Sequence, residues 1–112
     1  LFSRRLIRWQ PETIVQLPAG IGILPFMLPS SDELSEATVE SLREHRNTVW
    51  AQHGDMARSD ISVTRAVDRI EYAEAGGRYE YMDLQVGGGG EGLTNEESAQ
   101  MVEAFGIETK LF

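Results

Sequence analysis

Cysteine is absent from this 112-residue sequence, and basic residues are few: ten Lys and Arg stand against 18 Asp and Glu, a formal net charge of −8. The lack of cysteine excludes disulfides and thiolate metal sites, and it suits a reducing, cytoplasmic location, which we expect. An acidic surface repels nucleic-acid phosphate and anionic lipid, so we expect neither nucleic acid nor a membrane as a partner. Long apolar runs are also missing, which excludes a membrane-spanning helix.

The rest of the composition is that of an ordinary globular protein. Hydrophobic residues make up 41% of the chain and charged residues 25%, which fits a single domain over residues 1–112. The chain opens on Leu1 and Phe2 without an initiator methionine, and no signal-peptide pattern follows. Because large apolar side chains are unusual at a frayed terminus, we expect these residues to be a piece of a longer protein.

Hydrophobic periodicity and turn residues predict an α/β fold with two or three strands and three helices. A short helical or turn segment over 3–9 comes first. A capping box of Ser30 and Glu33 predicts a helix that runs to about residue 46. Such a small sheet leaves uncovered edges, which again indicates a missing part of the domain. The predicted strands cover residues 12–17 and 48–53, with 20–24 as a candidate third.

The second half of the chain predicts a loop and then a long helix. The loop runs from Gly54 to Asp60. Apolar residues then recur at intervals of three and four from Val63 to Leu84, the pattern of a long amphipathic helix that buries this apolar stripe. Its interior Gly76-Gly77 pair costs about 1 kcal/mol per glycine relative to alanine, so we expect close packing or a kink there.

The glycine run Gly87–Gly90 is typical of a connector. It is not a phosphate loop, because no Gly-Lys-Ser/Thr follows it. A capping box of Thr94 and Glu97 then predicts a last helix, for which Gly106 is the C-terminal stop.

Three side chains are candidates for chemistry. His45 falls in the last turn of a predicted helix, where a cation is favoured, and a capping or surface role is expected for it. His53 ends the predicted strand on the face shared with Val49 and Ala51, so it is either a boundary histidine or a ligand that projects into a cleft. Glu12, at the head of the first predicted strand, is either a general acid or base or the partner of a nearby arginine. One histidine alone does not complete a zinc site, which needs three or four protein ligands.

Several segments together resemble a known family. The most specific is residues 17–29, LPAGIGILPFMLP, followed by Ser31-Asp32-Glu33. Residues 50–54 (WAQHG) and 70–74 (IEYAE) match two further motifs in the same order. The chain thereby resembles the C-terminal part of the bacterial rhamnulose-1-phosphate aldolases, in the class II aldolase/adducin-like family. The loop at 87–92 and one extra residue between His53 and Ile70 depart from the pattern, at places where insertions are tolerated.

The resemblance implies a fold, a reaction and two site residues. The fold would be an incomplete C-terminal portion of a three-layer α/β/α class II aldolase-like domain. The reaction would be zinc-dependent cleavage of a phosphorylated ketose, L-rhamnulose 1-phosphate, to dihydroxyacetone phosphate and L-lactaldehyde. His53 would be one of three histidine ligands of Zn²⁺, and Glu12 would relay a proton at a subunit boundary. The other ligands, the main catalytic base and the phosphate site would lie in a missing N-terminal half of a homotetramer, so these 112 residues alone would be inactive.

Two alternatives stay open from the sequence. One keeps the family but changes the substrate, as in a fuculose-phosphate-type aldolase or a pentulose-phosphate epimerase. The other is a non-enzymatic, adducin-like interaction module.

Overall fold

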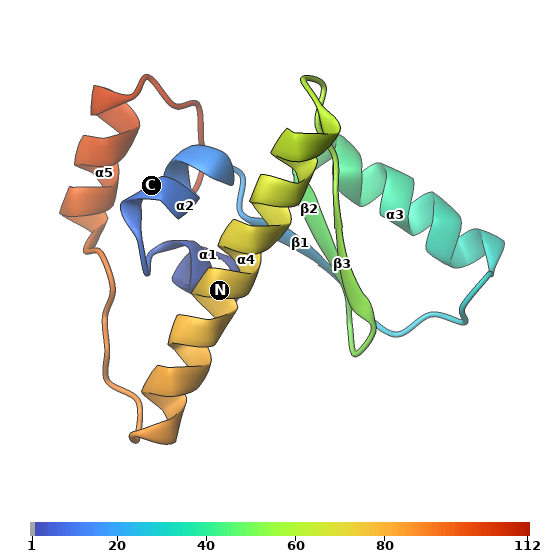
Figure 1. Ribbon diagram of the computed structural model, residues 1–112, viewed down its shortest axis with the longest axis horizontal. Coiled ribbons are helices and arrows are strands. Elements are labelled where there is room, and N and C mark those ends of the chain that lie inside the picture. The colour runs from blue at the N-terminus through green and yellow to red at the C-terminus, as the bar shows by residue number, and fades with distance from the viewer. Residues whose placement is uncertain (1) are drawn as a thin grey trace.

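The computed structural model describes the backbone of residues 2–112 and the side chains of residues 5–112; the predicted apolar start at Leu1 lies outside them. The elements are α1 (Phe2–Ile7), α2 (Pro11–Gln16), β1 (Ile21–Leu24), α3 (Asp32–Glu44), β2 (Asn47–Trp50), β3 (Gly54–Ala57), α4 (Val63–Gln85) and α5 (Asn95–Ala104). Figure 1 shows a small sheet with one helix, α3, on one side and a longer helix, α4, on the other, while α1, α2 and α5 lie beyond the long one.

The sheet has the order β1-β2-β3, with β1 and β2 parallel and β2 and β3 antiparallel. Helix α3 makes the crossover between the two parallel strands and packs on both of them, whereas α1 and α4 contact the sheet as well and α4 lies on its other side. The predicted α/β class and its α/β/α layering are therefore confirmed. In register, Ile23 faces Val49 and Trp50 faces both Leu24 and Gly54.

Residues 12–17 were predicted as a buried strand, and this prediction is wrong. They belong to helix α2, which begins at Pro11, a residue whose fixed φ suits the first turn of a helix. The buried side chains Thr13, Ile14 and Leu17 follow helical spacing and not the alternation of a strand. The candidate strand over 20–24 is confirmed as β1.

The segment Gly54–Asp60 is also different from the prediction of a loop. Residues Gly54–Ala57 form β3, which pairs with β2 as a hairpin. The predicted strand 48–53 is shorter than expected, because β2 ends at Trp50 and the chain turns over residues 51–53.

The N-cap of helix α3 lies one residue later than predicted, at Ser31 instead of Ser30. Ser31 is the N-cap and its hydroxyl accepts from the Leu34 backbone N–H at 3.2 Å, whereas Ser30 has φ +64° and lies outside the helix. The Ser30–Glu33 box is therefore wrong by one position. Leu34 and Thr38 are buried.

Helix α4 has the predicted length but buries a different face. The apolar stripe remains exposed, with Val63 82%, Val67 48%, Tyr81 62% and Leu84 60% accessible. The buried side is narrower and consists of Arg69, Ala73, Gly76 and Glu80. Within the part of the chain that the structure describes, the prediction that the apolar stripe faces inward is therefore wrong for most of the stripe and holds for Ala73.

The end of the chain follows the prediction closely. Both hydrogen bonds of the Thr94–Glu97 capping box are present at the start of α5. Gly106, at φ +60°, ends the helix, and the Ile107 N–H donates to the Val102 carbonyl at 2.9 Å in the pattern of a Schellman motif. The hydrophobic core lies where α1, β1 and α4 meet; its buried residues are Leu6, Ile7, Leu17, Ile21 and Ala73.

Candidate functional site

His53 lies in the tight turn that joins β2 to β3. Its backbone N–H donates to the Trp50 carbonyl at 3.0 Å, and Gln52 adopts φ +61° to close the turn. The imidazole is exposed. The predicted alternation with Val49 and Ala51 is wrong, since His53 lies in the turn after β2 instead of ending the strand.

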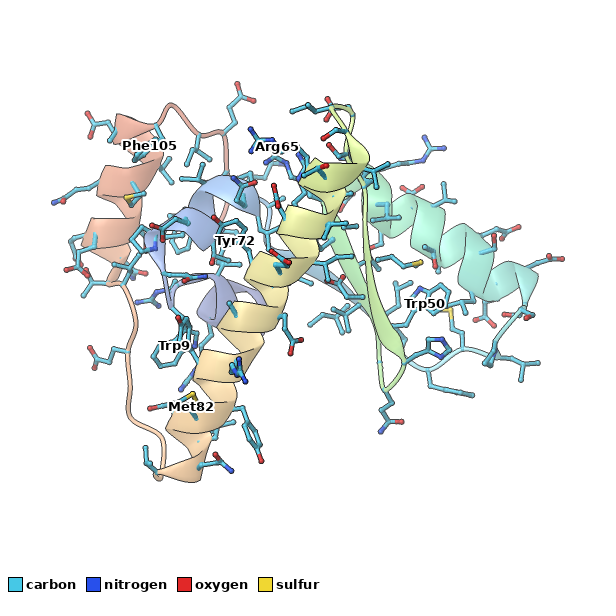
Figure 2. All side chains as sticks on the ribbon, in the orientation of Figure 1. Trp9, Trp50, Arg65, Tyr72, Met82 and Phe105 are labelled. Atoms are coloured by element: carbon cyan, nitrogen blue, oxygen red, sulfur yellow. The ribbon has the colours of Figure 1, made fainter. Side chains whose placement is uncertain are left out.

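The His53 ring contacts the indole of Trp50. The two ring centroids are 5.1 Å apart and the planes meet at 61°, an edge-to-face arrangement. The Trp50 Nε1–H donates to Thr38 Oγ1 at 3.0 Å, and Thr38 Oγ1 donates to the Leu34 carbonyl at 2.6 Å. Figure 2 shows Trp50 on the side of the sheet where α3 packs. Helix α3 is thus linked through one hydrogen bond, from Trp50 to Thr38, to the side chain that touches His53, and a second bond within the helix orients the Thr38 hydroxyl.

A small cleft of about 140 Å³ opens beside this pair. One wall is the proline-bounded segment that follows β1, and the other is the hairpin turn. Its lining is largely apolar, and His53 is its titratable residue. The lining residues are Pro25, Phe26, Met27, Pro29, Leu34, Trp50, Ala51, Gln52 and His53.

The described residues supply one candidate metal ligand at this place and not a full set. The imidazole of His53 makes no hydrogen bond to a described residue, so both ring nitrogens are available to a ligand. Within residues 2–112, however, no group of three His, Cys, Asp or Glu side chains is placed to hold a metal ion. Because zinc takes three or four protein ligands, His53 fits as one ligand of a site completed from outside these residues.

Glu12 lies in the first turn of α2, where a negative charge meets the positive end of the helix. It is exposed, and no ion pair to it is found among the described residues. A hollow of about 370 Å³ lies beside it, and Tyr72 and Phe105 line this hollow as well. Arg5 and Arg8 bind other partners, Glu80 with Asp83 and the Leu93 carbonyl, whereas the Arg4 side chain lies outside the described residues.

One copy of the chain does not bring Glu12 and His53 together. In Figure 2, Tyr72 and Phe105, which share the hollow of Glu12, lie on one side of α4, whereas Trp50 lies on the other side, beyond the sheet. Because the His53 ring touches Trp50, the two predicted site residues belong to separate surfaces.

His45 has the structural role that was predicted for it. It is the C-cap of α3, and its Nδ1 lies 3.1 Å from the Ser41 carbonyl. This carbonyl belongs to the last turn of the helix, where free acceptors need partners. His45 is therefore a capping residue.

Sequence reasoning missed a buried polar group at the base of the hairpin. The Asn47 amide donates to Asp55 Oδ2 at 2.9 Å and to the Arg69 carbonyl at 3.1 Å. Burial raises the pKa of Asp55, while the Asn47 hydrogen bond opposes this shift. Sequence reasoning also missed the hydrogen bond between Trp50 and Thr38. The signal that could have indicated it is a threonine on the core-facing side of a predicted helix, because a buried hydroxyl needs a partner.

The described helices include none with the length and apolar character needed to cross a bilayer.

No protein-family model matches the chain. The chain is, however, similar to individual rhamnulose-1-phosphate aldolases. The protein of Listeria monocytogenes is 33% identical over 109 residues, and that of Klebsiella pneumoniae is 32% identical over 108 residues. Over almost its whole length the chain is similar to the rhamnulose-1-phosphate aldolases. The match covers 97% of the chain but 40% of the Listeria protein's length.

Solved structures agree on the fold. A sugar-phosphate aldolase from Thermotoga maritima matches 81% of the chain with a TM-score of 0.72 and 28% identity, and the match covers 39% of that protein. YgbL from Escherichia coli also has a TM-score of 0.72, at 17% identity over 90% of the chain, which bears on the fold alone. The chain is thus a partial class II aldolase-like domain, and the family resemblance is confirmed.

Proposed function

We propose that this chain is the C-terminal part of a zinc-dependent aldolase that cleaves L-rhamnulose 1-phosphate to dihydroxyacetone phosphate and L-lactaldehyde. The observation that carries the proposal is the similarity to rhamnulose-1-phosphate aldolases over 97% of the chain. It gains support from an exposed imidazole, His53, on a rigid hairpin beside a cleft. The main catalytic base and the phosphate site would come from residues outside this chain.

His53 would hold the zinc as one of three histidine ligands. The metal would supply Lewis-acid stabilisation of the negative charge that develops on the substrate oxygens, which contributes several kcal/mol. The contribution of this chain is to present a neutral imidazole from a turn fixed by the two strands β2 and β3. The neighbouring apolar cleft would exclude water from part of the site, which strengthens electrostatic interactions there.

Glu12 would act as a proton relay. When the carbon–carbon bond breaks, the hydroxyl of the departing fragment loses its proton as the aldehyde carbonyl forms, and a carboxylate is suited to take up or pass on this proton. Because Glu12 and His53 lie on separate surfaces of one copy, they would meet only if two copies share a site. A homotetramer, in which subunits bury such surfaces against one another, would satisfy this requirement.

A second candidate is a different sugar phosphate. The structural match to the Thermotoga sugar-phosphate aldolase, at 28% identity, supports the reaction class without fixing the substrate. The two substrates, rhamnulose 1-phosphate and fuculose 1-phosphate, have opposite configurations at the carbon that becomes the aldehyde group of L-lactaldehyde. Comparing the rates at which the protein cleaves them therefore separates the two candidates.

The test is zinc content and aldehyde release in the full-length protein that contains this chain. His53→Ala should lower zinc occupancy and abolish cleavage while the fold stays intact, and His45→Ala is the matched control because His45 caps a helix. Full zinc and full activity in His53→Ala would overturn the site assignment. A wild-type protein that is folded but binds no zinc and cleaves no sugar phosphate would instead favour an interaction module.

A further inference from the structure

We infer that Trp50 is a positioning residue for the His53 imidazole, and that Thr38 anchors Trp50 from helix α3. The inference rests on the proposed function, in which His53 binds the metal. It adds the two side chains that would hold the ligand in place, Trp50 at the end of β2 and Thr38 in helix α3.

The connection consists of three contacts in series. Thr38 Oγ1 donates to the Leu34 carbonyl one turn earlier in α3, at 2.6 Å, which fixes the orientation of the hydroxyl. The same oxygen accepts the Trp50 Nε1–H at 3.0 Å. The indole then contacts the His53 ring edge-to-face at 5.1 Å between centroids. Thr38 is buried, with 8% of its surface accessible, so water does not readily replace it as the partner of the indole.

An exposed histidine in a turn needs such support if it is to bind a metal in one orientation. A ligating imidazole normally gives its second N–H to a carboxylate or carbonyl, which fixes the ring. His53 makes no such hydrogen bond to a described residue. The Trp50 contact is therefore what restricts the imidazole within this part of the protein, and restriction before binding reduces the entropy lost on binding.

Trp50 is itself well placed for this role. It is the last residue of β2 and is paired with Leu24 on one side and with Gly54 on the other, so its backbone is held by both neighbouring strands. Its carbonyl accepts the His53 N–H at 3.0 Å, which fixes the backbone of the turn. The hydrogen bond to Thr38 then fixes the side chain. Losing that bond would free the indole while leaving the sheet intact.

The experiment uses the full-length protein and three variants. Thr38→Val keeps the shape of the side chain and removes the hydroxyl; Thr38→Ser keeps the hydroxyl; Trp50→Phe removes the indole N–H. Trp9→Phe is the control, because Trp9 also donates a hydrogen bond, to Glu80, but far from the hairpin. The readouts are zinc affinity by chelator competition, the visible spectrum of the cobalt(II)-substituted protein, and the NMR shifts of the His53 ring in the metal-free protein.

We expect Thr38→Val and Trp50→Phe to lower zinc affinity by about tenfold, in the range that supporting residues contribute around metal ligands. Both should alter the cobalt(II) spectrum and change the ring-current shift of the His53 protons, because the ring beside His53 is moved or replaced, whereas Thr38→Ser and Trp9→Phe should leave all three readouts near wild type. Unchanged affinity and spectrum in Thr38→Val would overturn the inference, even if Trp50→Phe fails to fold. Unchanged zinc binding in His53→Ala would overturn the proposed function instead, and the metal-free NMR shifts would still test the positioning.

Discussion

Gly76 in helix α4 lies directly against Leu6 of helix α1. A Cβ at position 76 would be 2.5 Å from Leu6 Cδ2 and 2.7 Å from the Leu6 carbonyl oxygen, closer than such atoms approach in proteins. The adjacent Gly77 is different, because its Cβ would be 3.9 Å from Leu6 Cδ1, an ordinary contact distance. The predicted compensation for the glycine pair is therefore confirmed as close packing, and it applies to one glycine of the two.

This difference predicts opposite effects of two alanine substitutions. Gly76→Ala should lower the free energy of unfolding by about 1–3 kcal/mol, the usual cost of overpacking, because the Leu6 backbone cannot move aside easily. Gly77→Ala should raise it by up to about 1 kcal/mol through better helix propensity. Urea unfolding of the full-length protein measures both. Equal effects at the two positions would contradict the packing of α1 on α4.

The Glu80 carboxylate holds α1 and α4 together by a second means. It accepts from Arg5 Nε at 2.8 Å and from Trp9 Nε1 at 2.9 Å, and it is 7% exposed. The hydrogen bond and the charge of Glu80 raise the pKa of Arg5.

Glu80→Gln should cost about 1–3 kcal/mol of stability, since a buried amide at position 80 has one acceptor oxygen for the two donors and leaves its own NH₂ group without a described acceptor. Glu74→Gln, at an exposed position of the same helix, is the control and should change stability little. The measurement is the free energy of unfolding in denaturant. An unchanged value in Glu80→Gln would show that solvent replaces the carboxylate as the partner of these donors.

The interior of α4 explains one limit of sequence reasoning. Hydrophobic periodicity identified the helix and its length but assigned the wrong face to the core. The buried side carries Arg69 and Glu80, which are tolerated because Glu80 accepts hydrogen bonds from Arg5 and Trp9 and Arg69 donates to the Arg58 carbonyl. Such partners lie far away in the sequence, so periodicity could not reveal them. The apolar stripe that periodicity did detect is exposed here, as expected of a partial domain whose relatives are longer.

The second limit of sequence reasoning concerns short helices and strands, such as α2 and β3. The β-branched run from Thr13 to Val15 favours a strand by propensity, but Pro11 at the first helical position and burial at helical spacing prevail. The opposite occurs in β3, where Gly54 and Asp55 are poor strand formers and pairing with β2 decides the structure. His53 was identified as a candidate because it precedes a glycine in a recognisable motif. Predicting its contact with Trp50 would have required the geometry of the turn over residues 51–53, which the sequence does not specify.

The capping box of α5 predicts a dependence of stability on pH. The Glu97 carboxylate accepts from the Thr94 backbone N–H at 2.8 Å, which lowers the pKa of Glu97 below its ordinary value of 4.5. A carboxyl whose pKa is lower in the folded than in the unfolded state contributes stability above the unfolded pKa, and this contribution is lost as the pH falls through the folded value.

Glu97→Gln should therefore be less stable than wild type at neutral pH, and the difference should shrink below about pH 4.5. The measurement is the difference in free energy of unfolding between the two proteins at several pH values. Glu96→Gln, an exposed neighbour without this hydrogen bond, should show a much weaker pH dependence. A constant difference for Glu97→Gln would contradict the role of the carboxylate charge.

The separation of Glu12 from His53 leads to the last prediction. Glu12→Gln alone should retain zinc and lower the rate of cleavage by about 10²–10⁴-fold, the range expected for a general acid or base. Glu36→Gln, exposed on α3, is the control and should leave the rate unchanged. If each site takes His53 from one copy and Glu12 from another, the two inactive variants should complement each other.

Mixing Glu12→Gln subunits with His53→Ala subunits tests this directly. In a random one-to-one oligomer, about a quarter of the sites would combine an intact His53 with an intact Glu12 from a neighbouring copy, because each intact residue is present in half of the subunits. Activity should therefore return on subunit exchange and rise toward about a quarter of the wild-type value. A mixture that exchanges subunits, as shown by mass spectrometry, yet stays as inactive as its components would exclude a site shared between copies.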